Sequence, residues 1–292
     1  MNPILENPSK NSAFAGLLGT VRGLKFKRVE FDCPVHGKQV YEVPETSINA
    51  PKCPVCALEE SARQKRLEDA KADSRSRERE LINLLHPAVV DSDLMTFGAF
   101  FPETENAEKA LAITRRFAKN FTTREAVRIE KQNVQDAKFV KVNSIGLLLY
   151  GNSGCGKTHL ANAICSELKE QGWGSMMLTA SELIFKFQSV YRYEEKTRIA
   201  NLLSMIPVLV IDELGRQRGT DAGSEFLWNV INDRVRLGRP LILITNHSGE
   251  EVKQMVDTSV FDRLRSATFP ILFDWISHRK TVAKTVDPMS IF

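Results

Sequence analysis

The second half of the chain predicts an α/β fold: a three-layer domain in which a central parallel sheet of five strands lies between two layers of helices. Two observations predict it. Short apolar runs recur after about residue 140, and amphipathic stretches of helical length lie between the earlier ones. A phosphate-binding loop pattern also follows the first run directly. The five runs are IGLLLY (145–150), SMMLTA (175–180), PVLVID (207–212), LILITN (241–246) and FPILFD (269–274).

The composition is that of a globular protein that is neither exported nor membrane-bound. Of 292 residues, 42% are hydrophobic and 26% charged, and the net charge of +4 permits contact with nucleic acid without arguing for it. No apolar run approaches the roughly 20 residues of a membrane span, and the first 30 residues lack a signal-peptide core. The cysteine spacing is typical of metal ligands in a reducing compartment, so we expect a cytoplasmic protein.

Changes in composition divide the chain into four predicted segments. Residues 57–82 contain no glycine or proline and mix both charge signs, which suits a solvated helix acting as a spacer or a partner surface; a merely exposed helix is the alternative. The predicted segments are an N-terminal module that holds three of the five cysteines (1–56), a charged helical linker (57–93), the α/β domain with the phosphate-binding loop (94–285) and a tail (286–292).

The sequence GNSGCGKT, from Gly151 to Thr158, fits the phosphate-loop pattern G-x-x-x-x-G-K-[ST], with a strand before it and a helix after it. Its glycines let the backbone N–H groups face the phosphates of ATP at the positive end of the helix dipole. Lys157 brings a positive charge to the β- and γ-phosphates, and the Thr158 hydroxyl is a ligand for Mg²⁺. The predicted nucleotide-binding residues are Gly151, Asn152, Ser153, Gly154, Cys155, Gly156, Lys157, Thr158 and His159.

Polar residues end two further strands of the predicted sheet. Asp212 and Glu213 follow an apolar run, at the sheet edge where α/β proteins bind ligands. Asp212 is expected to hold Mg²⁺ through water, and Glu213 to orient and polarise the attacking water. Asn246 ends the next strand, where its amide can bond the γ-phosphate or that water, although asparagine is also a common turn former.

Cys33, His36, Cys53 and Cys56 form two pairs, C-P-V-H and C-P-V-C, separated by 16 residues. Three thiolates and one imidazole at this spacing predict a tetrahedral Zn²⁺ site, which would staple a segment too small to be stable by burial alone. Four protein ligands leave no open position, so the zinc should be structural. Free thiols and a surface histidine are the alternative.

A segment of mixed basic and aromatic residues, FKFQSVYRYEEK (185–196), lies between the second and third core strands. Bases of single-stranded DNA stacking on Phe187, Tyr191 or Tyr193, with Lys186 and Arg192 on phosphates, would bind without sequence preference. Packing of the same aromatic side chains into the core is the competing hypothesis. Arg216 and Arg218, just past the acidic strand, are further candidates for contact with DNA.

The region from about residue 94 to 285 resembles the helicase loaders of the DnaC and DnaI type, which share the AAA+ fold with the IstB-type transposition ATPases. The motifs that carry this resemblance are TFGAFF, GNSGCGKTHLANAIC, VLVIDELG, ITN, FDRLR and ILFDWISHR. The resemblance implies a shortened AAA+ ATPase domain. The zinc module is not general to DnaC-type loaders and looks more like the N-terminal modules of DnaI-type and phage-encoded loaders.

The resemblance also implies a mechanism and partners. Arg263 is the expected arginine finger, acting in trans on ATP bound by a neighbouring subunit, and Arg265 is the neighbouring candidate. The implied function is ATP-dependent loading of a hexameric, DnaB-type replicative helicase onto single-stranded DNA during replication initiation, by subunits that self-associate. An IstB-type ATPase regulating DNA transposition is the alternative.

Overall fold

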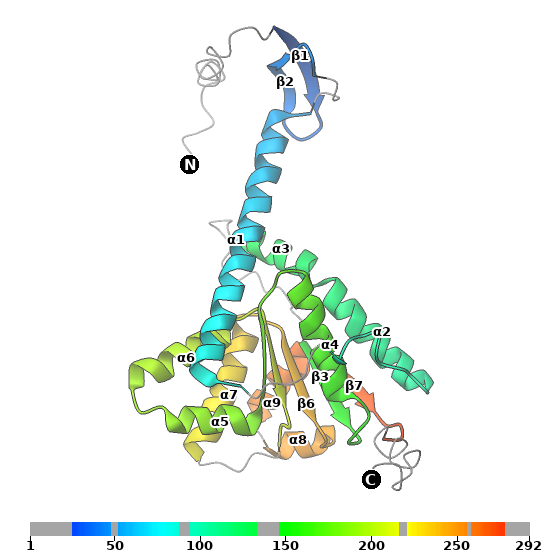
Figure 1. Cartoon of the computed structure of the whole chain (residues 1–292), viewed down its shortest axis with the longest axis vertical. Coiled ribbons are helices and arrows are strands. Elements are labelled where there is room, and N and C mark those ends of the chain that lie inside the picture. Colours follow the sequence, from blue (N-terminus) through cyan, green and yellow to red (C-terminus); the bar gives the residue numbers. More distant parts are fainter. Residues whose placement is uncertain are drawn as a thin grey trace, which may run out of the picture. The chain divides into compact units, whose positions relative to one another are not determined.

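The computed structural model forms two compact units, Met1–Lys65 and Arg66–Phe292, and its elements are labelled in Figure 1. The predicted tail at 286–292 lies outside the described residues. The described residues are 25–47, 52–87, 94–132, 146–215, 221–255 and 258–277.

The first unit contains a β-hairpin and the beginning of a long helix. Strands β1 (Phe26–Cys33) and β2 (Gly37–Pro44) pair antiparallel, and Gly37 closes the turn with a φ of 67°, a conformation that suits glycine. Helix α1 (Pro54–Leu85) starts with a proline, which has no N–H to leave unpaired in the first turn. Its residues up to Lys65 belong to this unit.

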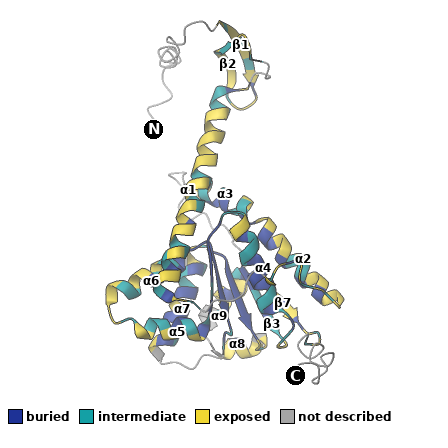
Figure 2. Cartoon of the chain, viewed as in Figure 1, coloured by how far each residue is buried: buried dark blue, intermediate teal, exposed yellow. Residues whose placement is uncertain are grey.

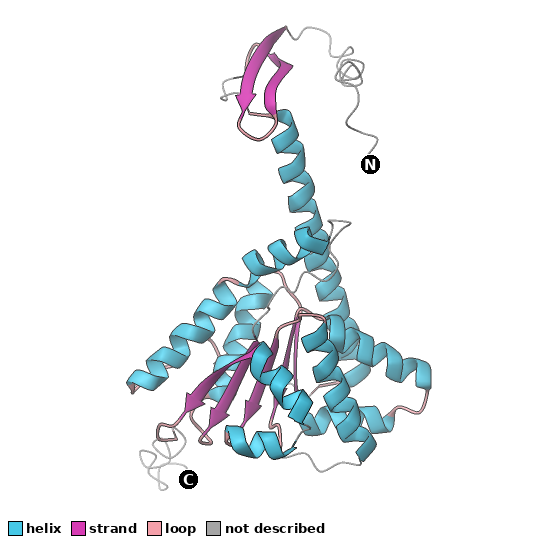
Figure 3. Cartoon of the chain, turned by 180° about the vertical axis from the view of Figure 1, so that it is seen from behind, coloured by secondary structure: helices cyan, strands magenta, loops and turns pink. Residues whose placement is uncertain are grey.

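The second unit is built on the predicted parallel sheet of five strands, which confirms the predicted fold class. The strand order is β4-β5-β6-β3-β7, and every neighbouring pair is parallel. Figure 3 shows that these strands run in one direction between helices. The strands are β3 (Gly146–Gly151), β4 (Ser175–Thr179), β5 (Val208–Asp212), β6 (Leu241–Thr245) and β7 (Thr268–Phe273).

Local signals fix several helix starts in this unit. Thr104 caps α2, accepting a hydrogen bond from the Ala107 N–H. Thr179 and Glu182 form a reciprocal capping box at the start of α5.

None of the described helices is both long and apolar enough to span a membrane. The helices after α1 are α2 (Glu105–Lys119), α3 (Phe121–Gln132), α4 (Lys157–Glu170), α5 (Ala180–Ser189), α6 (Tyr193–Met205), α7 (Asp221–Arg236), α8 (Gly249–Met255) and α9 (Thr258–Ala267).

Alternate residues of the strands pack into two apolar clusters, one on each face of the sheet. Leu209 and Ile211 of β5 face the cluster with α5, α6 and α7, whereas Val208 and Val210 face the cluster with α2 and α4. Figure 2 shows the sheet as the most deeply buried layer, with the outer helix faces exposed. Both faces are therefore covered, as a parallel sheet requires.

The second half of α1 differs from the predicted linker. Leu81 and Leu85 are fully buried in the cluster with α5, α6 and α7. The Ser74 hydroxyl accepts a hydrogen bond from the Gly174 N–H at 2.9 Å, just before strand β4. Residues 66–85 are thus part of the second compact unit, which begins earlier in the chain than the ATPase domain predicted at 94–285.

Candidate nucleotide site and metal cluster

The phosphate loop joins β3 to α4, and two of its glycines occupy positions where a side chain would clash with neighbouring atoms. Gly151 has a φ of 117°, and a Cβ there would lie 2.4 Å from the carbonyl oxygen of Phe273. Gly156 precedes α4 with a φ of 86°, and its Cβ would lie 2.6 Å from the ring of Phe100. No side chain among the described residues caps α4, so its first N–H groups are available for an anion.

Lys157 is buried at the start of α4. Its ammonium donates to the carbonyl oxygens of Gly151 at 2.8 Å and Asn152 at 2.6 Å, both within the loop. Burial lowers the pKa of the Lys157 ammonium, and Asp212 partly opposes this shift. A cation held in this way is placed to bind phosphate.

Two oxygen ligands of the kind that Mg²⁺ prefers meet at the point where α4 begins and β5 ends. The Thr158 hydroxyl donates to Asp212 Oδ2 at 2.7 Å, and Asp212 Oδ1 accepts from the Glu213 N–H at 2.6 Å. Burial raises the pKa of the Asp212 carboxyl, while these two hydrogen bonds act in the opposite direction. A hydroxyl and a partly desolvated carboxylate fit a magnesium ion bound with nucleotide phosphates.

These residues line a cleft of about 340 Å³. It brings together the predicted residues from Ser153 to His159 with Asp212, Glu213 and Asn246. Asn152 has another place: its side-chain amide donates to the Asp274 carbonyl at 3.1 Å, and so ties the loop to the chain that leaves β7. The Asn152 side chain thus supports the loop, and its contact with the nucleotide stays a prediction.

Several lining residues were not assigned to the nucleotide from the sequence. Five of them lie in TFGAFF and in the FDWI segment, both of which carried the family resemblance without a role at the site, and the other four flank TFGAFF or end strand β6. His159 bonds the Thr96 carbonyl at 2.8 Å and meets the Phe100 ring edge-to-face. Apolar walls of this kind accommodate a flat base. The additional lining residues are Met95, Ala99, Phe100, Phe101, Glu103, Ile244, Thr245, Trp275 and Ile276.

The two arginine-finger candidates lie on α9. Arg263 and Arg265 are both exposed, and neither is among the described residues that line the cleft of their own chain. Arg263 donates to the Asn232 side-chain oxygen at 2.5 Å, on the neighbouring helix α7. This position leaves the Arg263 guanidinium near the surface.

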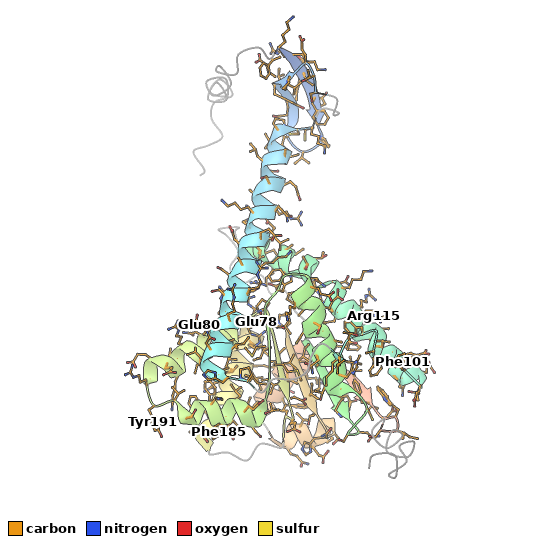
Figure 4. The ribbon with its side chains drawn as sticks, viewed as in Figure 1. Glu78, Glu80, Phe101, Arg115, Phe185 and Tyr191 are labelled. Atoms are coloured by element: carbon orange, nitrogen blue, oxygen red, sulfur yellow. The ribbon has the colours of Figure 1, made fainter. Side chains whose placement is uncertain are left out.

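The aromatic residues between β4 and β5 divide into two groups. Phe187 packs inward: its ring stacks on Phe226 with centroids 4.0 Å apart, so core packing is the observed alternative for this residue. Tyr191 is 95% exposed, and Tyr193 and Arg192 are also exposed. Figure 4 shows Tyr191 and Phe185 on the outer side of the α5–α6 region. Arg216 and Arg218 lie outside the described residues.

The predicted zinc ligands meet in the first unit. One ligand atom from each of Cys33, His36, Cys53 and Cys56 lies within 4.8 Å of every other. The Cys33 and Cys56 sulfurs are 3.6 Å apart, and His36 Nδ1 is 3.3 Å from the Cys56 sulfur. Thiolates about 2.3 Å from a tetrahedral Zn²⁺ would have similar separations. The cluster can therefore hold a zinc ion, and Glu59, 3.3 Å from His36 Nε2, adds an outer partner.

The phosphate loop, the acidic strand end and the sheet order define the class as a P-loop ATP-binding protein of the AAA+ type. The sequence profile described as "IstB-like ATP binding protein" matches residues 107–283, more than half of the chain. The chain belongs to this family.

Two of the similar proteins are named as replicative helicase loaders. The replicative helicase loader DnaC of Escherichia coli K12 is 29% identical over 143 residues, which cover 48% of this chain and 58% of that protein. The replicative helicase loader DnaI of Bacillus subtilis 168 is 29% identical over 109 residues, 38% of this chain and 35% of that protein. The chain thus spans about half or less of the length of these relatives.

A solved structure has the same fold. The crystal structure of the DnaC helicase loader aligns with a TM-score of 0.52 at 20% identity, covering 64% of this chain and all of that one. The similarity to DnaC and DnaI loaders that the sequence motifs predicted is confirmed by these comparisons.

Proposed function

We propose that this protein hydrolyses ATP to load a replicative DNA helicase onto single-stranded DNA during replication initiation. The main support is that Lys157, Thr158, Asp212 and Glu213 line one cleft in a chain whose relatives include two replicative helicase loaders. A nucleotide-binding adaptor without hydrolysis would not need the acidic pair.

Each side chain has a role that follows from its position. Lys157 binds the β- and γ-phosphates, and Glu213 orients and polarises the attacking water. Asn246, at the cleft end of β6, bonds the γ-phosphate or the same water. Mg²⁺, held by Thr158 and through water by Asp212, would neutralise charge that develops on the phosphates.

Arg263 acts on ATP bound by a neighbouring subunit. Its exposed place on α9, away from the lining of its own cleft, suits a finger supplied in trans. Hydrolysis would then require self-association of the chain. Arg265, exposed on the same helix, is the second candidate.

Single-stranded DNA would contact the α5–α6 region. Tyr191 and Tyr193 offer exposed rings for base stacking, and Arg192 and Lys186 offer charge for phosphates. Phe187 is left out of this surface because it packs on Phe226. We also infer that the zinc module serves binding to the helicase or DNA, and that the protein acts in the cytoplasm.

Regulation of DNA transposition is the second candidate function. The family match, described as an IstB-like ATP binding protein, favours it. An ATPase of this kind would assemble on duplex DNA and would not bind a helicase. The named loader relatives and the FDW ending at Phe273–Trp275 favour the loader.

The decisive experiment is size-exclusion chromatography and pull-down of the full chain with the replicative helicase of its host, with and without ATP and single-stranded DNA. We expect a complex that changes with nucleotide and an ATPase that responds to both partners. Lys157→Ala should lose the nucleotide response, whereas Lys169→Ala, an exposed lysine on the same helix, should keep it. Absence of any helicase complex, with ATP-dependent assembly on duplex DNA, would favour transposition.

A further inference from the structure

A single buried hydroxyl lies between the two strand ends that carry Glu213 and Asn246. Thr245, the last residue of β6, is 1% exposed. Its hydroxyl donates to the Leu214 carbonyl oxygen at 2.7 Å and accepts from the His247 N–H at 3.1 Å. Leu214, the partner in the first bond, directly follows Glu213, and His247, the partner in the second bond, directly follows Asn246.

The backbone that this hydroxyl holds is strained. Glu213 has a φ of 56°, in the left-handed region that residues with a Cβ rarely occupy. Such a conformation persists only where surrounding bonds impose it. Three bonds do so here: Leu214 N–H to the Ile244 carbonyl at 2.9 Å, Thr245 to Leu214, and Glu213 N–H to Asp212 at 2.6 Å.

We propose that Thr245 is a positioning residue for hydrolysis, which fixes Glu213 and Asn246 relative to each other through its bridging hydroxyl. The proposal rests on the proposed ATP hydrolysis. Glu213 must point its carboxylate at a water beside the γ-phosphate, and Asn246 must reach the same place from the neighbouring strand. Because the Thr245 hydroxyl bonds the residue that follows each of them, it keeps both side chains directed at the same point.

The alternative role for Thr245 is to fill space at the end of a buried strand. Valine has nearly the same shape and no hydroxyl, so it separates the two roles. Replacing the hydroxyl by a methyl group leaves the Leu214 carbonyl and the His247 N–H without this partner. The strained turn at Glu213 then loses the bond from Thr245 to Leu214, while the packing is kept.

The test compares Thr245→Val and Thr245→Ser in the full-length chain, with single-stranded DNA and helicase present. We expect Thr245→Val to lower kcat about 10-fold or more, because a displacement of about 1 Å at a reacting group has effects of this size. KM and the affinity for ADP should stay within about 2-fold, since Lys157 and the phosphate loop are unchanged. Thr245→Ser, which restores the hydroxyl, should recover most of kcat.

A double variant adds a sharper readout. In the Glu213→Gln background the aimed carboxylate is already absent, so Thr245→Val should reduce kcat much less than it does alone. Full additivity would overturn the proposal, as would wild-type kcat in Thr245→Val or equal loss in the serine variant. A rise in KM with unchanged kcat would instead place Thr245 in nucleotide binding.

Hydrogen exchange tests the bridge without relying on hydrolysis. We expect faster exchange at the Leu214 and His247 amides in Thr245→Val, with unchanged exchange in β3 and β5. Unchanged exchange at both amides would overturn the proposal. If the wild-type chain hydrolyses no ATP with any partner, the proposed function fails, and this measurement still decides whether the bridge holds the strained turn. Should Thr245→Val not fold, Thr245→Ala takes its place in both measurements.

Discussion

In the first unit, the described residues bury only two side chains, and both are cysteines of the metal cluster, Cys33 and Cys53. In the second unit, two apolar clusters cover the sheet on both faces. A hairpin of two strands has too little apolar surface to be stable by itself, whereas a five-stranded sheet between helices has enough. We therefore expect the first unit to depend on metal bonds for its stability, whereas the second unit is stabilised by burial of apolar side chains.

Removal of the metal should have the largest effect, and only on the first unit. Structural zinc contributes about 10–16 kcal/mol of binding free energy in small zinc-folded peptides, so chelation should unfold β1 and β2. Hydrogen exchange in residues 26–44 should become fast, while the thermal transition of the second unit stays unchanged. Cys53→Ser should have the same effect, and Cys165→Ser, outside the cluster, should not. Persistent protection of the hairpin without metal would mean that metal bonds do not hold the first unit together.

A cavity in the second unit should have the next largest effect. Leu203 is fully buried in the cluster with α5, α6 and α7, so Leu203→Ala should lower the free energy of unfolding by about 2–5 kcal/mol. Val35 in the first unit is 74% exposed, and Val35→Ala should cost less than about 0.5 kcal/mol. Urea unfolding of both variants measures the contrast. Equal losses would mean that burial does not separate the units.

Loss of the outer partner of His36 should have a smaller effect. Glu59 Oε1 lies 3.3 Å from His36 Nε2, where it orients the imidazole for binding through Nδ1. Glu59→Ala should weaken zinc binding about 10- to 100-fold, measured by competition with a chromophoric chelator. Glu60→Ala, one residue further along the same exposed helix, is the matched control. If both variants bind zinc equally, the Glu59 contact has no role in the site.

The smallest effect concerns the charge buried in the nucleotide site. Burial raises the pKa of Asp212 in the folded protein, so its ionisation destabilises the fold above that pKa and has no cost below the unfolded value. Asp212→Asn should therefore stabilise the nucleotide-free second unit at neutral pH, by less than Leu203→Ala destabilises it. This gain in stability should disappear as the pH falls from above the raised pKa of Asp212 to below the pKa of the same carboxyl in the unfolded chain. Unfolding experiments across pH measure it, and a gain that grows toward low pH would contradict this sign.

The sequence predicted the sheet, the phosphate loop and the metal cluster because each has a local signature. Short motifs, whose spacing reflects their geometry, contain Lys157, Asp212 and the four residues of the cluster that can hold zinc. The charged composition of residues 57–82 concealed the burial of Leu81, since a few apolar residues near the end of a polar helix give a weak periodic signal. The orientation of Phe187 and the contact of Trp275 with the cleft depend on tertiary packing, which no local pattern encodes.

The hydrogen bonds from Gly174 to Ser74 and from Ser175 to Glu78 lie at the start of β4, which pairs with β5 alone among the strands that the structure describes. Strand β4 is thus an outer strand, and an unprotected outer strand is a template on which other chains can add. Helix α1 occupies the beginning of that edge and contributes Leu81 and Leu85 to the core below it. A chain that started at residue 94 would keep every residue of the nucleotide cleft and still be prone to aggregate.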